Sequence, residues 1–343
     1  MTQMLAVRPT GAQPVAADLL EIEDLVVEFH GRQGVIRAND GITLSVPRGI
    51  TLGIVGESGS GKSVLCRSIL RLLPATARAR VSGAIRYEGR DLLQLDEEQM
   101  RRLRGSEIGM IFQNPMTSLN PVWTIGDQVT EGLRVHQGLG AREARTRGVE
   151  LLARVGISSP ERRFDEHPHQ WSGGMLQRAV IAMAMAAEPR LLLADEPTTA
   201  LDVTIQDQIL ALLLDLQERT GTTLVLVSHD LAVVAETCDR LAVMYAGRVV
   251  ESASIAEIFT APKHPYTAGL LGSIPHAAQG RRLKPIPGQP PDLLHLPAGC
   301  PFAPRCPVST PDCAVTPVRL APVGPGHLTA CLYPERTGGG VAP

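Results

Sequence analysis

The chain has 343 residues, of which 44% are hydrophobic and 20% are charged, and its formal net charge is −2. This size and composition fit a globular protein with one large domain and an appendage, or with two domains. The near-neutral charge and the aromatic content of 3% argue against a nucleic-acid-binding protein, which needs a basic field or a base-stacking surface. No apolar run approaches the roughly 20 residues that span a bilayer, so we expect a chain that is soluble and cytoplasmic in type.

The N-terminal part predicts a tail followed by antiparallel strands. Residues 1–18 contain Pro9, Gly11 and Pro14 and lack the apolar core of a secretory signal, so we expect a flexible tail there. Apolar and polar residues alternate over 19–29 and again over 35–46, on either side of a turn at 31–34. Phe29 could stack on a nucleotide base from this β region, or it could be an ordinary core aromatic.

A glycine-rich loop follows a short apolar strand predicted over 51–55. The loop reads G-x-x-x-x-G-K-S and consists of Gly56, Glu57, Ser58, Gly59, Ser60, Gly61, Lys62 and Ser63. Glycines let successive N–H groups converge on one phosphate, and the helix predicted after the loop adds the positive end of its dipole. Lys62 supplies an ammonium for the outer phosphates and Ser63 a hydroxyl for Mg²⁺. The strand–loop–helix context favours this phosphate loop over a mere glycine-rich turn.

The middle of the chain alternates apolar strands with helices. Strands are predicted over 81–87, 108–113, 190–197, 222–228 and 241–251, the last with a hairpin turn. Helices are predicted over 96–103, 175–187, 202–220 and 230–238, and a helical lobe at about 114–171 interrupts the α/β body after a loop over 114–121. Such alternation indicates a mainly parallel sheet that is covered on both faces.

Two further groups of residues suit nucleotide chemistry. Asp195 and Glu196 end an apolar strand, where the first carboxylate would hold Mg²⁺ and the second would polarise the attacking water. The alternative is that these acids simply reach solvent in a loop. Ser172, Gly173 and Gly174 head a predicted helix and form a second anion-binding loop, the Ser172 loop. Because one nucleotide cannot easily need two such loops from one chain, we expect a dimer in which the Ser172 loop closes on the partner's nucleotide.

Taken together, these motifs resemble an ATPase subunit of an ABC transporter over residues from about 20 to 260. The likeness rests on 56–63, Gln113, 172–177, 191–196, 200–202 and 228–229, in that order. It implies a P-loop NTPase fold with an antiparallel β subdomain, an inserted α-helical lobe, and bound ATP and Mg²⁺. The resemblance further implies that Gln113 senses Mg²⁺ and the attacking water, and that His229 contacts the γ-phosphate. It implies that Asp202 couples the two nucleotide sites. The loop that binds the partner's γ-phosphate would consist of Ser172, Gly173, Gly174 and Gln177. Leu176 departs from the basic residue often found there in related importers.

Three stretches narrow the resemblance to the dipeptide/oligopeptide importer branch, namely 112–121, 262–267 and 299–307. This branch implies a peripheral subunit on the cytoplasmic face of the membrane that powers uptake of di- and oligopeptides. It also implies two transmembrane permease subunits, a second ATPase subunit that is a paralogue, and indirectly an extracytoplasmic peptide-binding protein. An importer of nickel or another small solute from the same branch stays open. A soluble ABC ATPase acting on nucleic acid or ribosomes is disfavoured, because the chain has one cassette and no sustained heptads.

The part from residue 263 to 343, the C-terminal extension, is Pro-rich and carries four of the six cysteines. Cys300, Cys306, Cys313 and Cys331 have the spacing C-x₅-C-x₆-C-x₁₇-C. A cytosolic chain is not expected to hold stable disulfides, and so short a module has little core of its own, which makes a metal staple reasonable. Four thiolates suit a [4Fe–4S] cluster or Zn²⁺. The peptide-importer ATPases that this segment resembles can carry such a cluster, which is our expectation. Zinc is the alternative, and absence of any metal is a further one.

Overall fold

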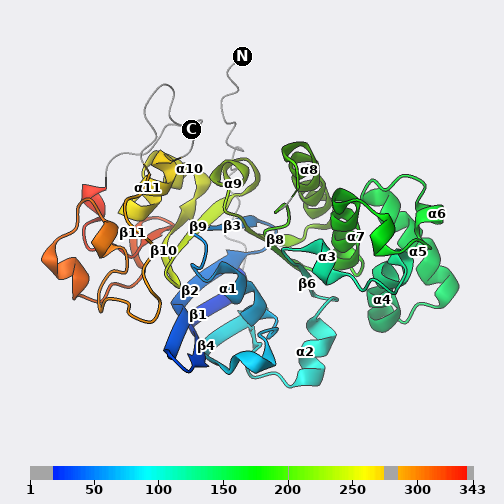
Figure 1. Ribbon diagram of the computed structural model, residues 1–343, viewed down its shortest axis with the longest axis horizontal. Helices are drawn as coiled ribbons and strands as arrows, with labels where there is room; N and C mark the ends of the chain where they lie inside the picture. Colours follow the sequence, from blue (N-terminus) through cyan, green and yellow to red (C-terminus); the bar gives the residue numbers. More distant parts are fainter. Residues whose placement is uncertain (1–17, 200, 274–284, 338–343) are drawn as a thin grey trace, which may run out of the picture. The chain divides into compact units, whose positions relative to one another are not determined.

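The computed structural model describes residues 18–199, 201–273 and 285–337 (Figure 1). The predicted tail over 1–18 lies outside these residues except for its last position, and so does Ala200 of the 200–202 motif. The chain divides into two units, a first unit of residues 1–93 and 228–343 and a second unit of 94–227. The domain boundaries expected from the sequence, at residues 18 and 262 and for the lobe at about 114–171, stay predictions.

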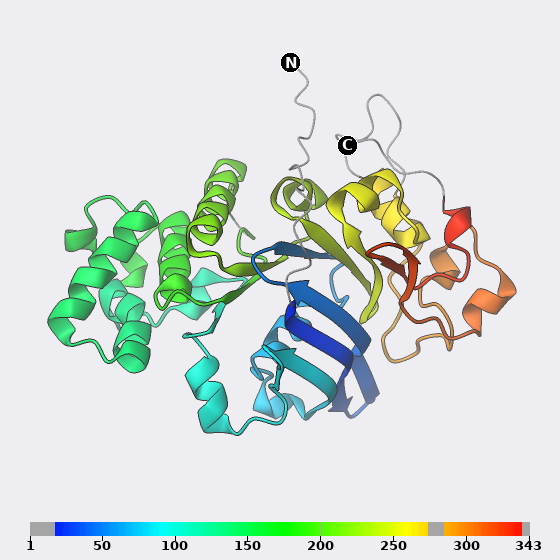
Figure 2. The same ribbon diagram turned by 180° about the vertical axis from the view of Figure 1, so that it is seen from behind.

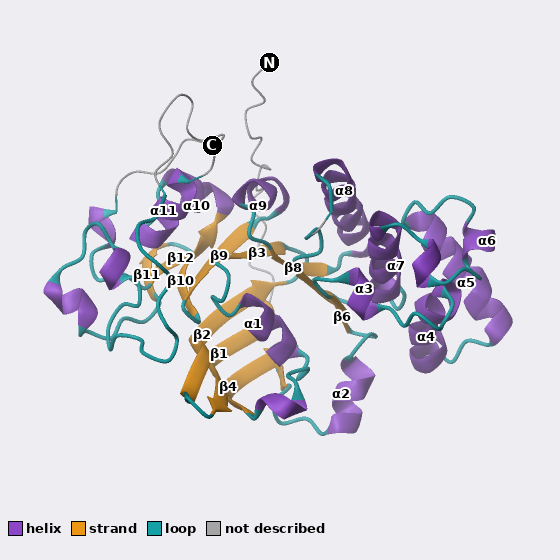
Figure 3. Ribbon diagram, in the orientation of Figure 1, coloured by secondary structure: helices purple, strands orange, loops and turns teal. Residues whose placement is uncertain are grey.

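The first unit begins with an antiparallel sheet, seen as a group of orange strands in Figure 3. Its strands follow the order β2-β1-β4-β5 and comprise β1 (Asp18–Gly31), β2 (Gly34–Pro47), β4 (Ala79–Tyr87) and β5 (Arg90–Asp91). Alternation explains the sheet in two short stretches, because Leu20 and Ile22 are buried on either side of Glu21, and Leu25 and Val27 on either side of Val26, with a register shift between the two pairs. The predicted antiparallel β region is therefore confirmed.

A second set of strands in the first unit carries the phosphate loop. β3 (Thr51–Val55) is buried along its whole length and pairs in parallel with β9 (Arg240–Tyr245). Antiparallel pairs extend the set through β10 (Arg248–Ser254), β12 (His327–Thr329) and β11 (Ala321–Gly324). The helices of this unit are α1 (Lys62–Ile69), α9 (Leu231–Thr237), α10 (Ile255–Thr260) and α11 (Pro265–Gly272). The C-terminal extension thus adds two strands, which the sequence analysis did not predict.

The second unit combines a parallel sheet with most of the helices. β7 (Leu191–Asp195) pairs in parallel with both β6 (Ile108–Ile111) and β8 (Thr223–Val227). The helices are α2 (Glu97–Leu103), α3 (Pro115–Ser118), α4 (Ile125–Gln137), α5 (Ala141–Arg154), α6 (Pro160–Arg163), α7 (Gly173–Met185) and α8 (Val203–Thr220), and the green helices α4 to α7 group together in Figures 1 and 2. The predicted loop over 114–121 contains a helical turn, because Asn114 caps it and Pro115 occupies its first position.

None of the helices in the part of the chain described here has the length and apolar character that a membrane crossing requires.

Candidate nucleotide site

The phosphate loop joins β3 to α1, and two of its glycines are required by close contacts. A Cβ on Gly56 would lie 2.1 Å from the carbonyl oxygen of Met244, and one on Gly61 would lie 2.2 Å from that of Ala38. Gly61 also has φ 98°, a left-handed conformation that side chains disfavour. The buried amide of Asn39, which the sequence analysis missed, donates to the Gly61 carbonyl at 3.1 Å and holds the end of the loop.

The ammonium of Lys62 lies inside this loop. Its Nζ donates to the carbonyl oxygens of Gly56 at 2.8 Å and Glu57 at 3.0 Å, and it lies 3.4 Å from Ser60 Oγ. Lys62 is only 6% exposed, whereas Ser58 and Gly59 face solvent at the rim. A buried cation bound to backbone oxygens fits a phosphate site, because phosphate oxygens would be stronger acceptors than the carbonyl oxygens it now contacts. Ser63, half-buried in the first turn of α1, has the hydroxyl that suits Mg²⁺.

The first unit also contains two other residues expected at the nucleotide. His229 is exposed and follows Ser228, whose N–H donates to the Ile54 carbonyl of β3 at 3.1 Å. Phe29 is half-buried in β1, opposite Ile36 of β2 and Ala79 of β4. Its ring is therefore neither a fully buried core aromatic nor a fully exposed one.

In the second unit, Glu196 directly follows the buried Asp195 at the end of β7. Its backbone has φ 48°, a strained value for a side chain of this kind, and its N–H donates to Val227 O at 3.1 Å. Its Oε2 accepts hydrogen bonds from Gln113 Nε2 at 2.8 Å and from Thr199 Oγ1 at 2.9 Å. The structure thus brings Gln113 and Glu196 together, and Thr199 is a partner that the sequence analysis missed. Strain held at a carboxylate is typical of a functional position.

The Ser172 loop starts α7 on the surface of the second unit. Ser172 Oγ caps the helix by accepting from Met175 N at 3.4 Å, and both Ser172 and Gly173 are exposed. Asp202 likewise caps α8, accepting from Ile205 N at 3.0 Å. A Cβ on Gly174 would lie 3.0 Å from Ile205 Cγ2, so the two helix starts lie side by side.

Gln177 does not share this surface, although it was grouped with the residues of the Ser172 loop. Its side chain is 1% exposed on the buried face of α7, one helical turn inside the protein. The helix period of 3.6 residues per turn places this position on the face of α7 that is buried. The assignment of Gln177 to the nucleotide-contacting loop stays a prediction.

The four cysteines of the C-terminal extension all lie in the first unit. Cys300 N donates to Cys313 O at 2.8 Å, and Cys300, Cys306 and Cys313 each affect the pKa of Cys331, which burial first of all raises to about 11. The thiols are therefore near one another and suit a metal in kind. However, no group of three or more metal-ligating side chains is arranged to hold an ion within residues 18–199, 201–273 and 285–337. The structure does not support the predicted [4Fe–4S] cluster, and it does not confirm a separate Cys-rich module.

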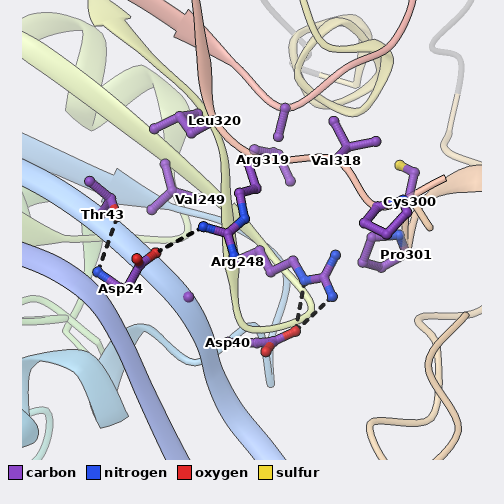
Figure 4. A pocket seen from close by; sticks show the side chains of 14 residues that line it. Asp24, Asp40, Thr43, Arg248, Val249, Cys300, Pro301, Val318, Arg319 and Leu320 are labelled. Atoms are coloured by element: carbon purple, nitrogen blue, oxygen red, sulfur yellow. Dashed lines mark hydrogen bonds and ion pairs between the residues drawn. The ribbon is translucent and has the colours of Figure 1, made fainter. Parts of the chain in front are cut away.

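A cavity of about 360 Å³ is lined by Cys300 of this group, and none of its lining residues belongs to the phosphate loop (Figure 4). Arg248 reaches across it to Asp40 of β2, with Nη2 to Oδ2 at 2.7 Å, and also donates to the Gly299 carbonyl at 3.3 Å. Arg319 lies 3.8 Å from Asp24 on another side of the cavity. These contacts attach the segment around Cys300 to the antiparallel sheet.

Comparison with known proteins gives two family matches. Residues 39–199 match the family described as ABC transporter, and residues 250–313 match the one described as oligopeptide/dipeptide transporter, C-terminal region. A probable peptide ABC transporter ATP-binding protein of Sinorhizobium fredii is 51% identical over 322 residues, which cover 93% of this chain and 96% of that protein. The oligopeptide transport ATP-binding protein OppD of Bacillus subtilis is 52% identical over 289 residues, 84% of this chain and 81% of that protein.

The fold has a counterpart among solved structures. A dimeric ATP-binding cassette in a post-hydrolysis state, bound to ADP and Pi, aligns with a TM-score of 0.62 at 29% sequence identity. The alignment covers 69% of this chain and 98% of that cassette.

Proposed function

This chain belongs to the ATP-binding subunits of ABC transporters, in the oligopeptide/dipeptide branch, and we propose that it powers the uptake of peptides through membrane permeases. The predicted resemblance, the P-loop ABC ATPase fold and ATP hydrolysis coupled to transport are confirmed by this membership. Permease partners follow from it as well. Four points are proposals: which solute is carried, what each site residue does, what the second ATPase subunit is, and on which face of the membrane the chain lies.

The observation that carries the proposal is the phosphate loop with its buried ammonium. Lys62 Nζ is held inside the loop by the carbonyl oxygens of Gly56 and Glu57. In the proposal it binds the outer phosphates of ATP, while the N–H groups of Gly59 to Ser63 surround them. The hydroxyl of Ser63, together with Gln113 and Asp195, would hold Mg²⁺, which neutralises charge on the phosphates when bound. Phe29 lies against the adenine base and His229 contacts the γ-phosphate.

Glu196 is the proposed general base. Its carboxylate is oriented by Gln113 and Thr199, which both donate to the same oxygen, Oε2. In the proposal this carboxylate accepts a proton from water as that water attacks the γ-phosphate in line. Gln113 Nε2 donates to Glu196. We infer that, when ATP is bound, this amide instead donates to the attacking water or binds Mg²⁺ through its oxygen, Oε1.

A second ATPase subunit would complete the site. Ser172 and Gly173 are exposed at the positive end of α7, so their N–H groups are available to phosphate oxygens of another molecule. Asp202, which caps the neighbouring helix, would couple the two nucleotide sites across the dimer. We propose that the second subunit is a paralogue.

The permease contact is proposed for the segment that follows Gln113. Met116, Val122 and Trp123 are 67%, 74% and 48% exposed, an unusual concentration of apolar surface within eight residues. Motion of Gln113 would reach this surface through α3. The chain would then lie peripherally on the cytoplasmic face of the membrane, and an extracytoplasmic binding protein would deliver peptide to the permeases.

Substitution of Glu196 tests the chemistry. In Glu196→Gln, ATP should bind with nearly unchanged affinity, while hydrolysis by the assembled transporter should slow by about 10²–10⁴-fold, because the amide cannot accept the proton. Glu218→Gln, on the exposed face of α8, is the matched control and should keep full activity. Wild-type turnover in Glu196→Gln would reject the role of general base.

Substrate identity needs a separate test. Cells that lack this chain should lose uptake of labelled di- or oligopeptides and regain it with the wild-type chain but not with Glu196→Gln. Loss of nickel uptake with normal peptide uptake would contradict the peptide proposal and favour the other solute class of this branch.

We also propose that the four cysteines bind a [4Fe–4S] cluster, with zinc as the alternative. The number, kind and sequence spacing of the four thiols support it, whereas the described residues form no group of three or more metal-binding side chains. Iron and acid-labile sulfide in equal amounts in an anaerobic preparation are the expected result. Zinc alone, or no metal, would contradict the cluster.

A further inference from the structure

The phosphate loop and the C-terminal extension are joined by an ion pair. Arg305 donates from Nη1 to Glu57 Oε2 at 2.8 Å and from Nη2 to Glu57 Oε1 at 3.0 Å, a bidentate pair. The two residues are 248 positions apart in sequence. The Arg305 side chain is 7% exposed and that of Glu57 24%, so the pair is largely withdrawn from solvent. Such a pair requires explanation, because desolvating both charges is costly.

Glu57 is held at three separate points. Besides the carboxylate pair with Arg305, its N–H donates to Tyr266 Oη at 2.9 Å, and its carbonyl accepts from Lys62 Nζ at 3.0 Å. Tyr266 lies on α11 and Arg305 lies further along the C-terminal extension. Two contacts to the second residue of the phosphate loop therefore come from outside the loop, and both come from the extension.

Arg305 is itself fixed in place. Its Nε donates to Pro287 O at 2.8 Å, and its Nη1 donates to Tyr245 Oη at 3.2 Å. The guanidinium carbon lies 5.8 Å from the ring centre of Tyr245 and 5.9 Å from that of Phe302. Tyr245, Tyr266 and Phe302 form an aromatic wall with ring centres 4.5–5.3 Å apart, and each ring is at most 2% exposed. The guanidinium is thus pre-organised for a carboxylate.

Charge gives this contact a consequence for nucleotide binding. Glu57 places a carboxylate beside a loop that has to accept the negative phosphates of ATP, and like charges at such range repel strongly where solvent is excluded. A guanidinium paired with both carboxylate oxygens cancels that charge. The alternative is a mechanical staple, in which the pair only attaches the extension to the phosphate loop. A neutral hydrogen-bonded pair could supply that attachment equally well.

We propose that Arg305 is a positioning residue of the phosphate loop, which fixes Glu57 and neutralises its carboxylate so that the loop accepts nucleotide phosphates. This inference rests on the proposed binding of ATP at that loop. It makes the C-terminal extension a part of the nucleotide site rather than a separate appendage.

Substitutions at both ends of the pair test the inference in the full-length chain assembled with its partner subunits. Arg305→Gln should raise the KM for ATP about tenfold or more and leave kcat within about twofold, because the unpaired carboxylate opposes binding of ATP. Glu57→Gln, which leaves a cation beside the loop, should give a KM equal to or below that of the wild type. The double variant Glu57→Gln/Arg305→Gln should bring the KM back to within about threefold of the wild-type value.

Matched variants separate charge from packing. Arg319→Gln removes an exposed arginine of the same extension, paired with Asp24 at 3.8 Å, and should leave the KM unchanged. Arg305→Lys keeps the charge without the bidentate geometry, so its KM should lie between those of the wild type and Arg305→Gln. If Arg305→Gln lowers the melting temperature too far for assay, Arg305→Lys provides the test in its place.

Two results would overturn the inference. One is an unchanged KM in Arg305→Gln; the other is an equal rise in KM for both single variants without recovery in the double variant, which indicates a mechanical staple. If the wild-type chain bound no ATP, the proposed function would fail instead, and the two failures are therefore distinguishable.

Discussion

The phosphate loop and the Ser172 loop both present glycines at the start of a helix, but their surroundings differ. The first is enclosed by its own unit: Gly56 packs against the Met244 carbonyl, Lys62 is 6% exposed, and Glu57 is held by the C-terminal extension. The Ser172 loop is open, since Ser172 and Gly173 are exposed, and Ser172 Oγ accepts a hydrogen bond from Met175 N. An enclosed loop can bind an anion by itself, whereas an open one offers its N–H groups to another molecule.

The largest effect should come from removing the charge of the enclosed loop. Lys62→Ala should weaken ATP binding by the full-length chain by about 10²–10³-fold, because a charge-assisted contact to phosphate is lost within a buried site. Titration calorimetry checks this, with Lys263→Ala as the control for loss of a lysine outside the loop. Retention of wild-type affinity in Lys62→Ala would remove the basis for the comparison.

Acid should weaken the unit that contains the phosphate loop. His264 caps α11, which carries Tyr266, and burial lowers its pKa to about 4 despite the charge of Glu251. Because the unfolded state has the ordinary pKa near 6.5, the neutral histidine favours folding above that pH. The free energy of unfolding should then fall by about 2 kcal/mol by pH 5 and by about 3 kcal/mol below pH 4.

Urea denaturation as a function of pH measures this contribution. His264→Asn keeps an acceptor for the Tyr266 N–H but does not titrate, so its acid limb should be flatter than that of the wild type. Identical acid limbs for the two proteins would assign the loss of stability to other groups.

Blocking the open loop should separate binding from hydrolysis. Ser172→Arg should leave ATP affinity of the isolated chain unchanged, since the phosphate loop is complete without it, but lower hydrolysis by the assembled transporter about 10- to 100-fold. Ser158→Arg, at another exposed serine of the second unit, is the control. If Ser172→Arg weakened ATP binding by the isolated chain, the distinction between enclosed and open loops would be wrong.

The smallest effect is expected at a surface ion pair of the second unit. Arg145 contacts Asp165 through two hydrogen bonds of 2.7 Å and lowers its pKa, but the side chains are 47% and 62% exposed. Asp165→Asn should lower the free energy of unfolding by at most about 1 kcal/mol at neutral pH, and by less at high salt. The difference from the wild type should vanish once acid protonates the wild-type aspartate. A larger loss in urea denaturation would show that this unit, too, depends on its ion pairs.

Local patterns predicted most of the first-order features. The alternation in β1 and β2, the apolar β3, and the phosphate loop each depend on neighbouring residues, and the structure has them where the sequence places them. The helix cap at Ser172 is also local. The turn α3 was missed because two prolines suggested an irregular loop, although a proline at the first position of a helix is favourable.

What was missed depends on contacts between distant residues. The stretch around Arg305 was noticed for its likeness to a family and for its cysteines, and nothing in its local pattern indicates that a guanidinium from it reaches Glu57. Strands β11 and β12 are four and three residues long, too short for a period to be recognised, and they form by adding to β10. The burial of Gln177 follows from the helix period. The sequence analysis did not predict this burial, because it considered Gln177 only as a member of the Ser172 loop.

The contact between Glu57 and Arg305 has a consequence during synthesis. A ribosome that adds about 5–20 residues per second needs roughly 10–50 s to proceed from one residue to the other, 248 positions later. During that interval the nascent chain has its glycines and its lysine but lacks the guanidinium that neutralises the loop. Nascent chains that stop before Arg305 would then bind ATP about tenfold more weakly than the full chain, so full affinity requires translation beyond that residue.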